Sequence, residues 1–598
     1  MSKTASEGSA SFADPVEQAE VSSDRPIESR TSTVGADVRH GVRLIVDYLG
    51  RDRWAAWSLV ALFMALHVAS SFNQVNFFTT VANSTTALAE RNSGVFWPLL
   101  AWSAGGLALM LSLNIVSSWC AFTLRIRARQ ALTTRYKDRW LAANRFYHLD
   151  RQFKIDHPEQ RIQEDVFVFV QYVVQNLPTL IIGFLPVFLY GGKLWALSQP
   201  IPVNVLGLHF VIEGFLIYAV AAFALIWTLA THFLGSGLTR AEIMRQRLEA
   251  QFRQEMAIIR ENSEAIAFER GAEVERKRLD ETFGLIRTNW RYYTFASLRV
   301  NFASSVPTLA LYIVPTLLCA PFILAGTMKI GDSTLVAAAV QSVYGAVGIF
   351  IAMYEVLAIL RSATSRLRYF DEMLDVAPVS NIQVVADAEA GYEARDLVIA
   401  YPDQRPMVRL NDLRIAPSQR LLITGPSGAG KSTLLRTIAG LWEHGAGLVR
   451  TPAKANVRFL PQRSFMPDGT LAGLMAYPRS PDQIDDLAYT TLLKRLGLEK
   501  LIPRLHEHAV WKRVLSPGEQ QRIAVARVVL DSPDFLFLDE ATSALDMDSE
   551  NRVYTLIRDA LPQAAIISVA HRPSVAQFHD TTLNLVLAED GCCEVARS

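Results

Sequence analysis

The stretch Gly425-Pro-Ser-Gly-Ala-Gly-Lys-Ser-Thr433 decides the fold of the last third of the chain. It follows the short apolar run Leu421–Ile423 and precedes Leu434-Leu-Arg-Thr-Ile-Ala439, which has the pattern of a helix. This strand–loop–helix order is the context in which G-x-x-x-x-G-K-[ST] binds the phosphates of a nucleotide. From about residue 391 onward, short apolar strands alternate with helical patterns, so we expect an α/β domain around this loop.

The loop has the residue types that phosphate binding needs. Its glycines let backbone N–H groups wrap the phosphates, and the helix that follows adds the positive end of its dipole. Lys431 can reach the β- and γ-phosphates, and the Ser432 hydroxyl can ligate Mg²⁺. The residues predicted to contact ATP here are Gly425, Ser427, Gly428, Gly430, Lys431, Ser432 and Thr433.

A second apolar strand, Phe535-Leu-Phe-Leu538, ends in the carboxylates Asp539 and Glu540. A pair of acids at a strand end is common in solvated turns. Beside a phosphate loop, however, the first acid suits the Mg²⁺ shell and the second suits a general base that polarises the attacking water. We therefore expect Asp539 to be a metal ligand and Glu540 to be catalytic.

The rest of the chain has the composition of a membrane protein. Of 598 residues, 50% are hydrophobic and 20% are charged, whereas soluble chains carry about 25% charge. Apolar stretches long enough to cross a bilayer, which takes about 20 residues in a helix, are predicted at 54–82, 96–124, 166–198, 206–234, 296–326 and 333–362. In the fifth of these, we expect Pro307, Pro315 and Pro321 to kink the helix.

Charge between the stretches predicts their orientation. The segment 125–161 has ten basic residues and 235–292 is rich in arginine, whereas the other connections carry few charges. Since positive residues stay in the cytoplasm, we expect both termini there, in a multi-pass protein of a bacterial inner membrane. The net charge of +1 argues against a nucleic-acid partner.

These patterns predict four parts along the chain. Residues 1–40 are polar and are expected to form a disordered cytoplasmic tail. The membrane domain is expected at 41–375, a linker at 376–390 and the nucleotide-binding domain at 391–598. The four cysteines lack CxxC spacing, so we expect isolated thiols and neither a zinc site nor a disulfide framework.

Between the phosphate loop and the acidic strand lies Leu515-Ser516-Pro517-Gly518-Glu519-Gln-Gln-Arg522. With it, the order of motifs resembles that of the ATP-binding cassette (ABC) transporters. The resemblance implies an α-helical membrane domain of six transmembrane helices, with the exporter-like type IV ABC fold, fused to an α/β P-loop domain that binds ATP and Mg²⁺.

The same resemblance implies roles for residues outside the two strands. Gln462 would sense Mg²⁺ and the membrane domain, and the switch residue His571 would act catalytically at the γ-phosphate. Ser516 and Gly518 would close on ATP held by the opposite subunit, with Asp546 at the dimer contact. Tyr401 would stack on adenine.

The signature departs from the common Leu-Ser-Gly-Gly-Gln. Pro517 replaces a glycine and Glu519 stands where glutamine is usual, which puts the turnover rate in doubt, whereas Ser516 and Gly518 are kept. Because signature and phosphate loop meet across two subunits in this family, the resemblance implies a half-transporter that works as a homodimer; a heterodimer stays open.

The segment His157-Pro-Glu-Gln-Arg-Ile-Gln-Glu-Asp165 resembles a motif shared by peroxisomal fatty-acyl half-transporters and the bacterial SbmA/BacA peptide transporters. The segments Phe252–Phe268 and Glu213-Gly-Phe215 resemble the same group. Because this chain carries a cassette, it resembles the cassette-bearing BacA-like (BclA-type) importers. The alternative reading of 157–165 is an ordinary charged helix start.

Glu213 and Glu355 fall inside apolar stretches, where a carboxylate is costly. We expect them to line a water-filled cavity, with simple helix packing as the alternative. His209, four residues before Glu213, would share a proton with it on a helix.

The expected function is ATP-driven import of antimicrobial or other polar peptides and bulky hydrophilic solutes. The alternatives are an exporter of drugs, lipids or peptides, a fatty acyl-CoA transporter, and an ATP-gated channel or sensor.

Overall fold

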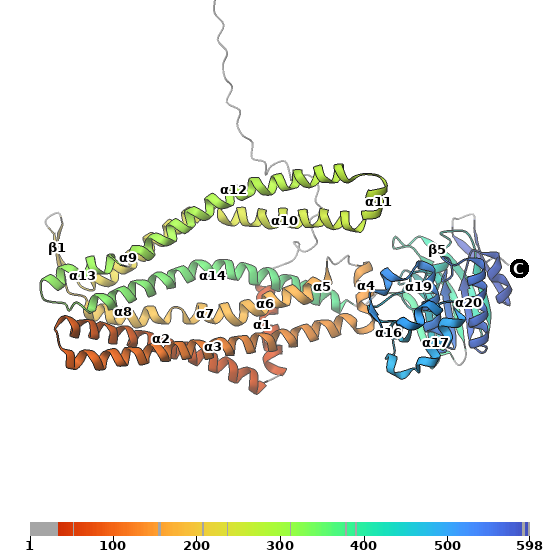
Figure 1. Cartoon of the computed structure of the whole chain (residues 1–598), viewed down its shortest axis with the longest axis horizontal. Helices are drawn as coiled ribbons and strands as arrows, with labels where there is room; N and C mark the ends of the chain where they lie inside the picture. The colour runs from red at the N-terminus through yellow and green to blue at the C-terminus, as the bar shows by residue number, and fades with distance from the viewer. Residues whose placement is uncertain are drawn as a thin grey trace, which may run out of the picture. The chain divides into compact units, whose positions relative to one another are not determined.

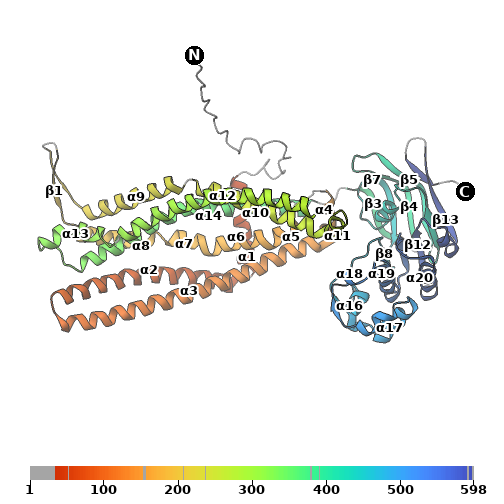
Figure 2. The same cartoon turned by 45° about the horizontal axis from the view of Figure 1, so that its top comes forward.

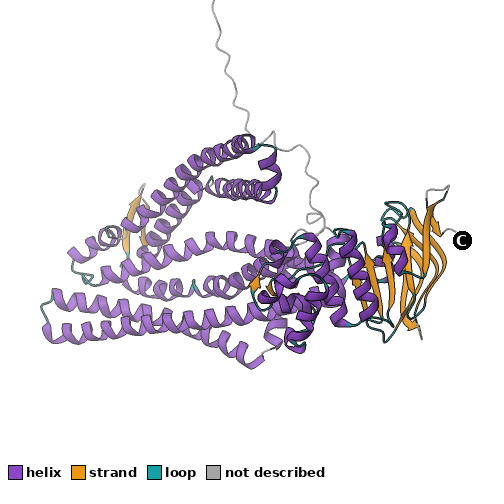
Figure 3. Cartoon of the chain, turned by 45° about the vertical axis from the view of Figure 1, so that its right-hand side comes forward, coloured by secondary structure: helices purple, strands orange, loops and turns teal. Residues whose placement is uncertain are grey.

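The computed structural model describes residues 34–51, 53–152, 157–205, 208–235, 237–310, 312–376, 380–388, 391–588 and 592–595. The chain divides into two compact units, residues 1–375 and 376–598. In Figure 3 the first unit is almost entirely helical, and the second contains a large sheet with helices packed on it.

The first unit is a set of long helices with one small β-hairpin (Figure 1). Its elements are α1 (Val34–Arg51), α2 (Arg53–Ala89), α3 (Ser93–Leu141), η3 (Ala142–Asn144), α4 (Arg145–Gln152), α5 (Pro158–Gln160), η4 (Arg161–Asp165), α6 (Val166–Gln171), η5 (Tyr172–Asn176), α7 (Leu177–Ile182), α8 (Leu185–Leu197), β1 (Ile201–Val205), β2 (Leu208–Ile212), α9 (Phe215–Gly235), α10 (Leu238–Glu261), α11 (Ser263–Phe268), α12 (Ala272–Ala310), α13 (Val314–Leu324) and α14 (Asp332–Asp375).

Among the described residues, three helical stretches are long and apolar enough to cross a membrane: Trp54–Ala89, Ser93–Arg151 and Pro158–Leu197. Two shorter apolar helices, Phe215–Ala230 and Val314–Leu324, lie in the predicted fourth and fifth spans. The sixth predicted span lies within α14, which has 44 residues. All six segments are therefore mainly helical, while the number that span the bilayer stays a prediction.

The predicted fourth span begins later than expected. Residues 201–212 form an antiparallel hairpin in which Ile201 lies opposite Ile212, and α9 begins at Phe215. Gly214 forms the corner with φ of +76°, and a Cβ atom there would lie 2.5 Å from Cζ3 of Trp195. A residue other than glycine would be both strained and in collision, so this corner interrupts the apolar pattern that suggested one continuous helix.

The fifth predicted span is broken as expected from its prolines. α12 ends at Ala310, and α13 begins at Val314 with Pro315 in its first turn. Proline is tolerated in a first helical turn because no intrahelical bond needs its missing N–H. Pro321 lies inside α13.

Two pairs of helices in this unit form antiparallel hairpins. α2 and α3 run side by side along their length, and α10 and α12 form a second helical hairpin with α11 at its turn (Figures 1 and 2). A buried cluster centred on Leu44, Tyr136, Phe169, Leu367 and Phe370 joins α1, α3, α6 and α14. Burial of these large apolar side chains holds α1 against the helices of the unit.

The second unit is a ten-stranded mixed sheet with helices on it. Its elements are β3 (Asn381–Ala388), β4 (Tyr392–Ala400), β5 (Pro406–Ile415), β6 (Arg420–Thr424), α15 (Lys431–Ile438), β7 (Gly445–Pro452), β8 (Val457–Leu460), β9 (Gly469–Thr470), α16 (Leu471–Ala476), η6 (Pro481–Gln483), α17 (Asp486–Arg495), η7 (Glu499–Arg504), β10 (His508–Ala509), α18 (Trp511–Val514), α19 (Pro517–Asp531), β11 (Phe535–Asp539), α20 (Met547–Ala560), β12 (Ala565–Val569), η8 (Pro573–Phe578), β13 (Thr581–Leu587) and β14 (Cys593–Val595).

The strand order is β3-β7-β4-β5-β14-β13-β6-β12-β11-β8. Strands β13, β6, β12, β11 and β8 pair in parallel, whereas β4 is antiparallel to both β5 and β7. The central strands β6, β11 and β12 are mostly apolar and buried, as expected for parallel strands that are covered on both faces, whereas five of the seven residues of β13 are exposed. Two buried clusters result, one on each side of this part of the sheet.

The structure moves two predicted boundaries. Residues 34–40, expected in the tail, are the first turns of α1, while residues 1–33 lie outside the described part. Residues 381–388, expected in the linker, form β3 and pair with β7. In both cases contacts with partners elsewhere in the chain accompany the regular structure of the segment. The four cysteines are buried free thiols, as expected.

Candidate functional site

The candidate nucleotide site lies at the carboxyl ends of three neighbouring parallel strands. The phosphate loop follows β6, Asp539 and Glu540 end or follow β11, and His571 follows β12. Since β12 lies between β6 and β11 in the sheet, the carboxyl ends of all three meet at one edge. This is where open α/β sheets bind ligands.

The phosphate loop has a backbone that glycine alone fits comfortably. Gly430 adopts φ of +82°, and a Cβ there would lie 2.5 Å from Cγ2 of Val408 on β5. α15 begins directly afterward at Lys431, so the first N–H groups of the helix face the loop. Close packing of β5 on the loop thus explains one glycine of the motif, in addition to its left-handed backbone.

Lys431 is folded back onto the loop. Its ammonium donates hydrogen bonds to the carbonyl oxygens of Gly425 and Pro426, at 2.8 Å each, and the residue is 5% exposed. Burial lowers the pKa of Lys431, and the nearby carboxylates of Glu540 and Asp539 oppose that shift. The side chain is therefore a buried cation that a phosphate could attract away from two neutral carbonyls.

Ser432 and Asp539 form the pair expected at a magnesium site. The Ser432 hydroxyl donates to Oδ1 of Asp539 at 2.7 Å. Burial raises the pKa of Asp539, while the hydrogen bond from Ser432 and the charge of Arg436 lower it. A hydroxyl and a carboxylate oxygen are ligands that Mg²⁺ accepts together with phosphate oxygens and waters, so these residues fit that ion.

Glu540 is held by both of its predicted neighbours. Nε2 of Gln462 donates to Oε2 at 2.9 Å, and Nε2 of His571 lies 3.1 Å from Oε1. The backbone of Glu540 is left-handed, with φ of +48°. Such strain in a residue other than glycine is typical of functional sites, and here it turns the carboxylate away from the strand toward Gln462 and His571.

The signature residues make a helix start. Ser516 is the N-cap of α19, and Pro517 occupies the first helical position, where proline is favoured. Oγ of Ser516 accepts from the Glu519 N–H at 3.3 Å, and Oε2 of Glu519 accepts from the Ser516 N–H at 2.8 Å. Of the two departures from the common signature, Glu519 therefore completes a capping box with Ser516, and Pro517 fits the first helical position.

The signature does not join the phosphate loop within one chain. In the described part of the second unit, Ser516 and Gly518 make no hydrogen bond to residues 425–433. A Cβ at Gly518 would lie 3.2 Å from the carbonyl oxygen of Ala544. The signature thus packs on the loop before α20, and not on the phosphate loop of its own chain.

Two residues that sequence reasoning missed hold that loop. Oε1 of Gln521 accepts from the Ala544 N–H at 3.0 Å, and Nη1 of Arg572 donates to the Leu545 carbonyl at 2.6 Å. Asp546 then caps α20 by accepting from the Ser549 N–H at 2.9 Å. In the sequence, the one indication of their role is that Gln521 lies close after the signature and Arg572 directly follows His571.

Tyr401 lies in the turn after β4. Its N–H donates to the Arg405 carbonyl at 2.8 Å, and the Arg405 guanidinium lies over its ring, 5.5 Å from the centroid. The ring is partly exposed, at 39%. Arg405, a third residue that was not predicted, stacks on Tyr401, whereas adenine stacking stays a prediction. Of the remaining loop residues, Gly428 is left-handed with φ of +81°, Ser427 is exposed and Thr433 is buried.

In the first unit, the motif at 157–165 ends in a buried ion pair. Arg366 of α14 contacts both carboxylate oxygens of Asp165, with distances of 2.5 to 3.0 Å. Arg161 of the motif reaches the same carboxylate at 3.1 Å. The stretch Arg161–Asp165 is π-helical, a conformation often found at functional sites. His157 and Glu159, in contrast, pair with each other at the exposed start of the motif.

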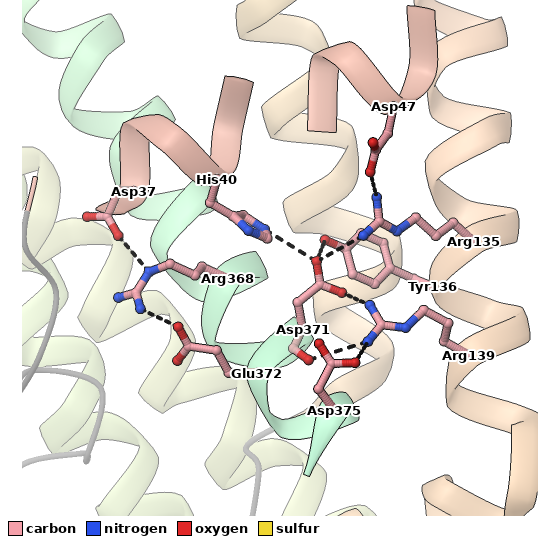
Figure 4. Close-up of polar contacts among 10 residues, drawn as sticks. All are labelled: Asp37, His40, Asp47, Arg135, Tyr136, Arg139, Arg368, Asp371, Glu372 and Asp375. Carbon is pink, nitrogen blue, oxygen red and sulfur yellow. Dashed lines mark hydrogen bonds and ion pairs between the residues drawn. The ribbon is translucent and has the colours of Figure 1, made fainter. Parts of the chain in front are cut away.

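A second polar network lies where α1, α3 and α14 meet (Figure 4). Asp371, 6% exposed, accepts from Arg139 and from Tyr136, and lies 3.4 Å from Nε2 of His40. Burial lowers the pKa of His40, which the charge of Asp371 opposes. The network was not predicted, because its members lie far apart along the chain.

The same figure shows a second set of contacts on the other side of α14. Arg368 bridges Asp37 of α1, at 3.0 Å, and Glu372, at 2.5 Å. Asp37 is 1% exposed, so this bridge is a buried anchor for the first turn of α1. The last turns of α14 are therefore tied to α1 and α3 by charge as well as by packing.

The expectation for Glu213 is wrong in its local structure. Glu213 lies exposed in the turn between β2 and α9, and His209 lies in β2. Residues four apart share a face on a helix but not across a strand and a turn, so the predicted proton-sharing pair does not form on a helix. Glu355 lies in α14, and its side chain is outside the described part.

Comparisons with known proteins cover both units. Residues 44–324 match the family model of the ABC transporter transmembrane region 2, and residues 409–543 match the ABC transporter model. The chain is 30% identical over 557 residues to an uncharacterized ABC transporter ATP-binding protein of Synechocystis sp., which covers 90% of this chain and 81% of that protein.

Two further relatives match over most of their length. The inner membrane ABC transporter ATP-binding protein YddA of Escherichia coli K12 is 28% identical over 497 residues, 83% of this chain and 88% of that protein. The lysosomal cobalamin transporter ABCD4 of Mus musculus is 26% identical over 608 residues, 93% and 97% respectively. Each similarity includes a membrane region followed by an ATP-binding region in one chain.

Proposed function

Since this chain belongs to the ABC transporter family, as a membrane-spanning half-transporter that couples ATP hydrolysis to transport, we propose that it imports peptides and other bulky hydrophilic solutes as a homodimer. The observation that carries the ATP-driven mechanism is the assembled edge site. Its Ser432–Asp539 pair and its Gln462–Glu540–His571 cluster form in one chain.

The site residues divide the chemistry between them. Lys431 and the loop N–H groups would bind the phosphates of ATP, and Ser432 and Asp539 would hold Mg²⁺, which would supply positive charge beside the phosphates. Glu540 accepts the proton of the attacking water, while Gln462 and His571 fix the direction of its two oxygens. A strained backbone and two polar neighbours leave this carboxylate little freedom, so it is pre-organised for the role.

The position of the signature supports the proposed homodimer. Gly518 lies against Ala544 and Leu545 of its own chain, and we propose that the signature meets a nucleotide bound by a second copy. Two copies related by a two-fold axis would complete two such sites at once. The arginines in α10 and near the end of α3 support a cytoplasmic position for the site and for both termini, because positive residues stay on that side of the membrane.

The substrate class rests on similarity. The anchored segment 157–165 resembles a motif of the SbmA/BacA peptide transporters, and the related mouse protein is named as a cobalamin transporter. Cobalamin is itself a bulky, water-soluble compound, which makes it a second candidate. The name of the mouse relative favours a large hydrophilic solute, whereas the motif at 157–165 also resembles that of fatty-acyl half-transporters and keeps an acyl-CoA as an alternative.

Uptake in cells tests this proposal. Cells lacking other peptide importers would produce either the wild type or Glu540→Gln at equal levels, and would receive a labelled proline-rich peptide or labelled cobalamin. Uptake of the peptide with the wild type alone supports the proposal. Uptake of cobalamin alone moves the function to the second candidate. If the cells take up neither solute and inverted vesicles show export, the proposed direction of transport is wrong.

A further inference from the structure

The glutamate of the signature has a specific counter-ion. Nζ of Lys500, in η7, lies 2.6 Å from Oε1 of Glu519, while Oε2 accepts from the Ser516 N–H at 2.8 Å. Glu519 is 7% exposed. Both oxygens of one buried carboxylate are therefore engaged, one by a helix cap and the other by a cation from a different segment.

A carboxylate in this place is an electrostatic problem for ATP binding. Ser516, three residues before Glu519, is the residue expected to meet a phosphate held by the second copy. Two like charges brought together in a closing, water-poor interface repel strongly, because the effective dielectric constant falls there. A neutral glutamine would avoid this repulsion, so a glutamate needs compensation.

Lys500 has the geometry to supply that compensation. Burial acts to raise the pKa of Glu519, but the hydrogen bonds from Lys500 and Ser516 overcome it, so the pKa is lowered and the carboxylate stays ionised. The Lys500 side chain is 71% exposed, so its ammonium also adds positive charge to the surface beside the signature. The pair is close to neutral as a unit.

The capping box leaves the serine ready for its partner. Oγ of Ser516 accepts from the Glu519 N–H, so the hydroxyl hydrogen remains free to donate to a phosphate oxygen. If the Glu519 carboxylate moved, the bond that it accepts from the Ser516 N–H would be lost, and Ser516 would lose that half of the reciprocal pair that orients it.

We propose that Lys500 is a positioning residue for ATP hydrolysis, which neutralises Glu519 and so allows the signature of one copy to close on ATP bound by the other. This inference rests on the proposed homodimer. Because Lys500 acts through Glu519, the proposal has a specific test. Removing Lys500 should raise KM for ATP only while position 519 carries a negative charge.

The experiment is a double-mutant cycle on the purified full-length protein in lipid vesicles, read as kcat and KM for ATP. The variants are Lys500→Ala, Lys500→Arg, Glu519→Gln and the double variant Lys500→Ala/Glu519→Gln. Lys494→Ala is the matched control, because Lys494 is an exposed lysine on the neighbouring α17. Unfolding temperatures of all variants are compared, so that a loss of stability is told apart from a loss of ATP affinity.

Lys500→Ala is expected to raise KM about fivefold, the upper range for losing an ion pair whose lysine is largely exposed, with Lys500→Arg close to wild type and Lys494→Ala unchanged. In the Glu519→Gln background, the same Lys500→Ala change should alter KM by less than about twofold, since interacting residues are not additive. An equal cost in both backgrounds, or no cost in either, would overturn the role of Lys500.

The readout separates this inference from the proposed function. ATP hydrolysis does not depend on which solute is carried, so failed peptide uptake leaves the cycle valid. A wild-type protein that stays monomeric with ATP by mass photometry would overturn the homodimer, and Lys500 with it. A dimer with an additive cycle would overturn Lys500 alone.

Discussion

Arg366, near the end of α14, donates hydrogen bonds to both carboxylate oxygens of Asp165, which lies 201 residues earlier in the chain. Asp165 is 2% exposed, and Arg161 approaches it from the same π-helical turn. The contact joins the start of the third apolar segment to α14, the helix that leads out of the first unit.

Asp165→Asn should destabilise the protein by about 3 kcal/mol, because it leaves Arg366 and Arg161 without their buried counter-charge. Thermal unfolding of the purified protein measures this loss. Glu159→Gln is the matched control, since Glu159 also pairs within the motif but is exposed, and its loss should cost less than about 1 kcal/mol. Equal unfolding temperatures for the two variants would contradict a stabilising role for the Asp165 pair.

Glu540→Gln should lower ATP turnover by about a hundredfold or more while ATP still binds, since the amide cannot accept a proton from water. ATPase rates and retention of labelled ATP by the dimer measure the two effects. Glu507→Gln, a change at an exposed ion pair of the same unit, should leave turnover unchanged. Near-normal hydrolysis by Glu540→Gln would remove Glu540 from its catalytic role.

Acidification should weaken Mg²⁺-dependent ATP binding at a higher pH than an ordinary aspartate would. Burial raises the pKa of Asp539 above 3.8, so protonation, which removes a metal ligand, begins earlier as the pH falls. Nucleotide titrations with Mg²⁺ across pH, beside titrations without the metal, check this sign. A binding curve that is flat down to the ordinary pKa of an aspartate would contradict it.

Asp539→Asn should stabilise the nucleotide-free protein at neutral pH although it abolishes Mg²⁺ binding. A carboxyl group whose pKa is higher in the folded state than in the unfolded state costs stability once it ionises. The cost is present above the folded-state pKa and vanishes as the pH falls below the unfolded-state value. Thermal unfolding at neutral and acidic pH tests this, because the gain from asparagine should shrink on acidification.

Gly430→Ala should cost more stability than Gly428→Ala, although both positions are left-handed, with φ of +82° and +81°. The backbone strain is about 1–2 kcal/mol at each. At Gly430 the new methyl group also meets Val408, whereas nothing lies within 4 Å at Gly428. Thermal unfolding of the nucleotide-free variants measures the difference. Equal losses of stability would show that β5 shifts to make room for the new methyl group.

The nucleotide site was largely predictable because its residues come in short motifs at fixed places. A phosphate loop needs consecutive residues. In an α/β fold the carboxyl ends of parallel strands lie at one edge of the sheet, and this brings Ser432, Asp539 and His571 to the same edge. The supporting residues Arg405, Gln521 and Arg572 were not predicted. Each acts on a loop backbone, and such a contact leaves no pattern in the sequence beyond adjacency.

The membrane unit was less predictable in detail. Apolar length predicted its helical segments, but the same composition hid the hairpin at 201–212, because apolar strands and helices look alike without a turn signal. The helical geometry assumed for His209 and Glu213 failed for that reason. The start of α1 and the strand β3 were not predicted, because their structure depends on partners elsewhere in the chain.

By itself, the sequence determined that this protein has a nucleotide-binding domain and long apolar helices, since contiguous motifs and apolar length act locally. The tertiary structure decided which charges compensate one another. Asp165 meets Arg366, Asp371 meets Arg139, and Glu519 meets Lys500. A buried charge is stable only beside its counter-charge, and which of many charged residues fills that place depends on how the helices pack.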